Sequence, residues 1–199
     1  MGYGIALKGA KVSDGGGNKF EPLEAGPIGL AVFDAKVEEY GPNTNNAGRD
    51  FLKIQFKVLD GQTGANRRLF ENVGLFPEWA PTDKNPDGSD NFTFFGFFAA
   101  VQGKKEKEFR AEVKAAIENE DESFSIPSAR ELLGKKVTAI IKIVPDDYAY
   151  KKYLQAVKDG DEEEGKTQSD FLKNTINGYK VYAEGEGAGA TKPKDGFVL

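Results

Sequence analysis

The sequence contains no cysteine and no histidine among its 199 residues. Without cysteine, no disulfide can stabilise the fold and no thiol can act as a nucleophile. Without histidine, the commonest general base, the usual catalytic triads and most zinc sites are excluded. Carboxylate, lysine or tyrosine chemistry and a magnesium site built from carboxylates remain open. We expect no enzyme here, and so no catalytic residues, no metal site and no cofactor.

Long hydrophobic runs are also missing from the sequence. No apolar stretch approaches the ~20 residues that span a bilayer, and the first residues lack the basic and apolar regions of a signal peptide. We therefore expect a cytoplasmic protein without a membrane partner. Hydrophobic residues make up 39% of the chain, enough for one core with appendages.

Glycine-rich segments at both ends predict appendages to a single domain of residues 26–182. Residues 1–25, with Gly15, Gly16 and Gly17 at their centre, are typical of a flexible arm. Residues 183–199 are typical of a disordered tail, since they cannot bury enough surface to offset chain entropy. The tail ends in an apolar tripeptide, residues 197–199, a candidate docking peptide for replication or recombination proteins.

Hydrophobic periodicity predicts five β-strands, with helices between the third and the fourth. Strict alternation of Leu52, Ile54, Phe56 and Val58 marks the clearest strand. A change of parity after Val32 predicts a bulge in the strand before it. The predicted strands are 26–41, 51–59, 67–75, 135–144 and 171–182, and the predicted helices are 92–101, 104–119 and a capped turn from Ser128.

This order of elements is that of the OB-fold, a five-stranded Greek-key barrel that binds oligonucleotides across strands two and three. Three stretches resemble phage-encoded OB-fold single-stranded DNA-binding proteins: the long first strand, residues 50–75, and the segment Leu133 to Val137. The resemblance implies non-sequence-specific protection of single-stranded DNA in phage replication or recombination, inside the bacterial host and without catalysis. Many such proteins end in a long acidic tail, whereas the last charges here are Lys192, Lys194 and Asp195.

A basic segment in an acidic chain supplies the first candidate site. The formal net charge is −5, yet residues 49–68 carry few acids and hold the cations Arg49, Lys53, Lys57, Arg67 and Arg68. Alternation turns Phe51, Lys53 and Lys57 outward, where a ring could stack on bases and lysines could pair with phosphates. The alternative is an ordinary amphipathic strand whose lysines only face water.

An aromatic and basic run supplies the second candidate site. Before the fifth strand, a predicted loop contains Tyr148, Tyr150, Lys151, Lys152 and Tyr153. Tyrosine offers a stacking face at little entropic cost, and this loop closes over the ligand in an OB-fold. Alternatively, the rings hold the loop against the barrel, and the acidic run 159–164 would repel DNA.

Other features favour structural roles or leave other functions open. Trp79 in its proline-rich segment is typical of a structural anchor. We expect the phenylalanines from Phe92 to Phe98 to form part of the core. Aspartates 83, 87 and 90 resemble a calcium loop but lack the closing glutamate. Three alternatives remain: a phage virion structural or assembly protein with a small β-barrel, a carboxylate-metal nuclease, and an RNA-binding OB protein.

Overall fold

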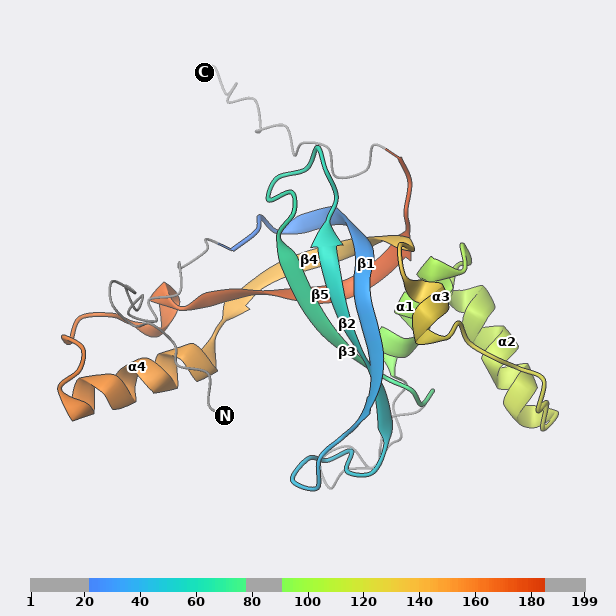
Figure 1. Ribbon diagram of the computed structural model, residues 1–199, viewed down its shortest axis with the longest axis horizontal. Coiled ribbons are helices and arrows are strands. Elements are labelled where there is room, and N and C mark those ends of the chain that lie inside the picture. The colour runs from blue at the N-terminus through green and yellow to red at the C-terminus, as the bar shows by residue number, and fades with distance from the viewer. Residues whose placement is uncertain (1–21, 78–90, 185–199) are drawn as a thin grey trace, which may run out of the picture.

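The computed structural model describes residues 22–77 and 91–184. Within these ranges the chain forms one sheet of five antiparallel strands, with four α-helices (Figure 1). The predicted class, mostly β with helices between strands three and four, is confirmed. The elements are β1 (Gly26–Glu39), β2 (Asp50–Val58), β3 (Arg68–Gly74), α1 (Phe92–Val101), α2 (Glu106–Glu118), α3 (Ala129–Leu132), β4 (Lys136–Pro145), α4 (Asp147–Asp159) and β5 (Leu172–Val181). Trp79, the three aspartates and most of the predicted tail and arm lie outside the described residues.

The long strand β1 organises the sheet, because it pairs with β2 on one side and with β4 on the other. The strand order is β3-β2-β1-β4-β5. The register with β2 shifts between Val32 and Asp34, so Phe33 forms the predicted bulge. This bulge reverses the parity of β1 and lets the strand bend across the sheet.

The core lies on one face of the sheet, beneath α1. The alternating residues Leu52, Ile54, Phe56 and Val58 of β2 are each at most 2% exposed, as the alternation predicts. Phe97 and Phe98 of α1 are fully buried, and Phe97 packs edge-on against Tyr179 of β5 at 5.4 Å between ring centroids. Phe92 is 63% exposed, so its assignment to the core was wrong: it is the first residue of α1, ahead of the buried face.

The remaining helices lie on either side of the sheet (Figure 1). The capping box at α3 is confirmed, because Ser128 Oγ accepts from the Glu131 N–H and the Glu131 carboxylate accepts from the Ser128 N–H at 2.8 Å. The helices α1, α2 and α3 gather on one side. The helix α4 lies on the opposite side, on an arm formed by the ends of β4 and β5.

The two edge strands, β3 and β5, border a groove of about 380 Å³. Within the described residues no β3–β5 ladder closes the sheet, so the observed sheet is open where a closed barrel was predicted. Arg67 and Phe70 border one side of the groove, and Lys173 and Thr175 border the other. Asn174, which also lines the groove, accepts a hydrogen bond from the Leu23 N–H at 2.7 Å and donates one to the Leu23 carbonyl at 2.9 Å.

Candidate nucleic-acid interface

The surface of β1, β2 and β3 opposite the core carries a cluster of cations. Directly opposed residues in antiparallel strands point to the same side, and the register pairs Lys53 with Lys36 and Lys57 with Arg68. Lys53 and Lys57 therefore point outward, as predicted. We call this surface the outer face; it comprises Phe33, Asp34, Lys36, Glu38, Lys53, Gln55, Lys57, Arg68, Phe70 and Asn72.

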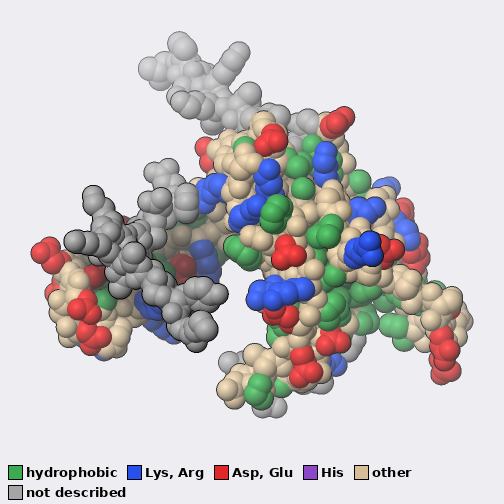
Figure 2. All heavy atoms as spheres, viewed as in Figure 1, with side chains coloured by type: hydrophobic (Ala, Val, Ile, Leu, Met, Phe, Trp, Pro, Cys, Tyr) green, Lys and Arg blue, Asp and Glu red, His purple; other side chains and the backbone are tan. Residues whose placement is uncertain are grey.

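Two exposed phenylalanines stand among these cations, and the sequence analysis missed both. Phe33 is 53% exposed and Phe70 is 67% exposed. The Arg68 guanidinium lies 3.3 Å above the centroid of the Phe33 ring, a cation–π contact that holds both groups on the surface. Figure 2 shows basic and hydrophobic side chains side by side over β1, β2 and β3. Rings and cations interleaved in this way are the groups that hold single-stranded nucleic acid.

A single carboxylate bridges two of the cations. Glu38 pairs with Lys36 on its own strand and with Lys53 of β2, whose Nζ lies 3.4 Å from Oε2. Hydrogen bonds from Lys36 and, to a lesser extent, Lys53 hold the pKa of the Glu38 carboxyl below its usual range. Glu38 thus places a carboxylate between the two lysines, where any other anion would have to compete with it.

The packing around Phe51, the second residue of β2, shows that the predicted exposure of its ring was wrong. Its ring is only 7% exposed because Tyr40 covers it, with ring centroids 4.3 Å apart. The Arg49 guanidinium lies over the buried ring of Phe76 at 4.5 Å. Strand parity turned Phe51 toward the outer side as expected, but its neighbours bury it, so it offers no stacking face.

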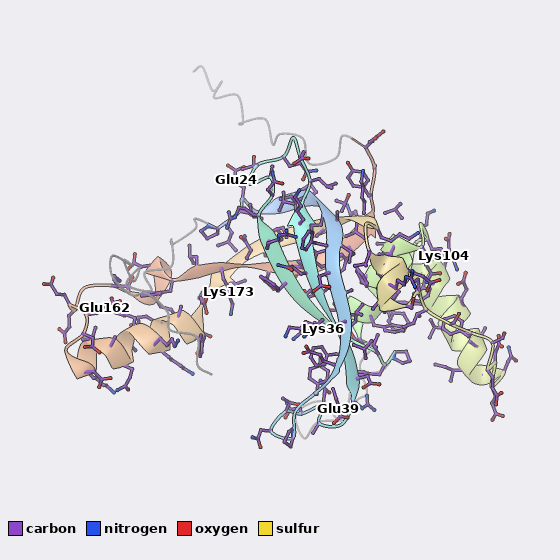
Figure 3. The ribbon with its side chains drawn as sticks, in the orientation of Figure 1. Glu24, Lys36, Glu39, Lys104, Glu162 and Lys173 are labelled. Atoms are coloured by element: carbon purple, nitrogen blue, oxygen red, sulfur yellow. The ribbon has the colours of Figure 1, made fainter. Side chains whose placement is uncertain are left out.

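The groove between β3 and β5 adjoins the outer face, and Arg67 and Arg68 stand at its rim. Glu71 of β3 lines the same groove, and burial raises the pKa of its carboxyl. Glu71 pairs with the fully buried Ile54 of β2, so it points to the inner side of the sheet. Lys173 stands across the groove on β5, 3.5 Å from Asp146 (Figure 3).

The aromatic run before β5 forms a helix rather than the predicted loop. Asp146 caps α4 by accepting from the Ala149 N–H at 3.3 Å, and Gly160 ends it with a positive φ of 80°. The spacing of Tyr150, Tyr153 and Val157 is helical, and this signal could have predicted the helix.

Only part of this run is available for binding. Tyr153 is 5% exposed, packs on Phe171, and its hydroxyl donates to the Glu163 carbonyl at 3.1 Å, so a stacking role for it is corrected to a structural one. Tyr150 also packs on Phe171. Tyr148 is 68% exposed and has the Lys152 ammonium 5.3 Å from its ring, while Lys151 is exposed beside them.

Neither a metal centre nor a membrane span is found in the part of the chain that the structure describes. Its acidic residues form no group of three or more that could hold a metal ion. None of its helices combines the length and the apolar character needed to cross a bilayer.

A scan of the chain against protein-family models finds no match, and a search of curated proteins gives no significant match.

Proposed function

We propose that this protein binds single-stranded DNA on the outer face, with little sequence preference and without catalysis, in phage DNA replication or recombination. One observation carries the proposal: Phe33 and Phe70 are exposed among Lys36, Lys53, Lys57 and Arg68 in a chain whose net charge is −5. Bases that stack on exposed rings remove the rings from water, and each stacked base contributes ~1–3 kcal/mol to the free energy of binding. A surface that served only solubility would not need them.

The strand order supports an OB-fold as the finer description of this sheet. In that fold the ligand crosses strands two and three, and the loops after strands one and four border it. Here β2 and β3 carry the cations and Phe70, and the connection after β4 contains α4 with the exposed Tyr148. The groove between β3 and β5 is the place where an OB barrel closes.

The path of the strand follows from the spacing of the cations. Lys53 and Lys57 are four residues apart on β2, about 14 Å at ~3.4 Å per residue, and Arg68 lies beside Lys57 on β3. An extended strand running along β2 would bring phosphates of alternate nucleotides to Lys53 and Lys57, while its bases stack on Phe33 and Phe70.

A fluorescence titration with oligo-dT and with duplex DNA, each at two salt concentrations, tests the proposal. We expect oligo-dT to bind more tightly than duplex, and to bind more weakly as salt rises, because bound cations release counterions. Equal affinity for duplex, or no binding of oligo-dT at low salt, would refute the proposal and favour the virion assembly alternative.

A further inference from the structure

The groove between β3 and β5 contains a half-buried acid, Glu71, that a surface for phosphates does not explain. Glu71 lines this groove together with Arg67 and Arg68 and with the β5 side chains across it. One of its carboxylate oxygens accepts from the Asn72 N–H at 3.1 Å. A carboxylate has about four lone-pair sites, so it keeps the capacity to accept from a ligand.

The groove has the size and the lining of a site for one base. Its volume of about 380 Å³ falls at the lower end of the range for small-molecule sites, ~300–1,000 Å³. Phe70, which projects from the outer face, also borders the groove, so a strand stacked on Phe70 has its next base at the groove. Arg67 and Lys173 stand on its two sides, where the flanking phosphates would pass.

The chemistry of Glu71 distinguishes among the four bases. Guanine alone presents two adjacent donors, N1–H and N2–H₂, on its Watson–Crick edge, and these match the two oxygens of a carboxylate. Adenine and cytosine place a ring-nitrogen acceptor beside the amino group, and thymine has carbonyls on both sides of its single N–H. Burial strengthens such a contact, because water competes less for the carboxylate.

We propose that the groove between β3 and β5 is a base-binding subsite in which Glu71 selects guanine, within binding that is otherwise tolerant of sequence. This inference rests on the proposed function and extends it to a base preference. Phe70 on the outer face stacks on the neighbouring base, and Glu71, which points to the inner side of β3 at the groove, accepts the two guanine donors. Arg67 and Lys173 contact the phosphates on either side.

The test compares three oligonucleotides that differ at one central position: oligo-dT, oligo-dT with one guanine, and oligo-dT with one hypoxanthine, which lacks only the 2-amino group. Fluorescence anisotropy at neutral pH measures their affinity for the full chain. We expect guanine to bind about fivefold more tightly than hypoxanthine, the low end for a bidentate base contact. Glu71→Gln should abolish this difference, and Glu118→Gln on α2 should retain it.

Each outcome has a distinct meaning. Equal affinity of the wild type for guanine and hypoxanthine would overturn the subsite without any variant being needed, while tight binding of all three would leave the proposed function standing. A guanine preference that survives in Glu71→Gln would also overturn the role of Glu71. Failure to bind any of the three would instead overturn the proposed function, and with it the subsite.

Discussion

Glu38 provides the sharpest perturbation of the outer face, because removing its charge should strengthen binding rather than weaken it. Glu38 bridges Lys36 and Lys53, and a phosphate held by either lysine would have to displace it or remain beside it. The substitution Glu38→Gln keeps the size of the side chain and removes the charge. We therefore expect tighter binding of single-stranded DNA.

The size of the effect follows from the geometry. The Lys53 Nζ lies 3.4 Å from Glu38, and a lysine–phosphate contact adds about 2.8 Å, so the carboxylate would lie roughly 6 Å from the phosphate. Coulomb's law at the dielectric constant of water then gives roughly a threefold gain in affinity for each phosphate. With Lys36 and Lys53 both released, we expect a gain of roughly three- to tenfold at low salt that fades as salt screens the charges.

Glu39→Gln is the matched control, since it removes the same charge from the next residue of β1, on the opposite side of the strand (Figure 3). Fluorescence titration with oligo-dT at low and at high salt compares both variants with the wild type. Similar gains in the two variants would show that only net charge matters. An unchanged or reduced affinity in Glu38→Gln would refute the placement of phosphates between Lys36 and Lys53.

Three further predictions follow from the same geometry. Replacing Lys53 and Lys57 by alanine should reduce the salt slope of binding by about 0.7 for each lost phosphate contact; an unchanged slope would place the DNA elsewhere. Phe70→Ala should weaken binding at every salt concentration with little effect on folding. Phe51→Ala should instead lower the free energy of unfolding, measured by urea denaturation, by about 3–5 kcal/mol. The reverse pattern would contradict the observed burial of the two rings. Burial raises the pKa of Glu71, so the folded protein holds the proton of this carboxyl more tightly than the unfolded chain does. The stability of the fold should therefore decrease as pH rises from the unfolded value of ~4.3 through the raised pKa. Urea denaturation at pH 4 and pH 7 should show the wild type losing stability relative to Glu71→Gln, and a relative gain would contradict this sign.

Local patterns predict the strands well, because alternation reports directly which side of a strand meets the core. The alternation in β2 predicts both its buried residues and its outward lysines, and the parity change after Val32 predicts the bulge. The same parity turns Phe33 outward, so this exposed ring could have been found from the sequence. Burial of Phe51 could not, since it depends on the return of Tyr40 across the β1–β2 connection.

Long-range register explains most of what the sequence leaves open. Phe70 reaches the outer face because β3 pairs it with Gln55, and the irregular connection between β2 and β3 does not fix that register locally. The groove around Glu71 forms between β3 and β5, which are about a hundred residues apart in the chain. The missed helix α4 is different: its cap at Asp146 and its helical spacing of rings were local signals.

Cross-linking tests most directly whether DNA binds the outer face. Oligo-dT carrying photoreactive 5-iodouracil would be irradiated with the full chain, and the modified peptides identified by mass spectrometry. Phe92, which is 63% exposed at the start of α1, serves as an internal control, because it is as accessible as Phe33 and Phe70 but lies outside the proposed site. We expect adducts on the peptides that contain Phe33 and Phe70, competed by unlabelled oligo-dT. Adducts on the Phe92 peptide, with none on β1 or β3, would contradict the proposed site.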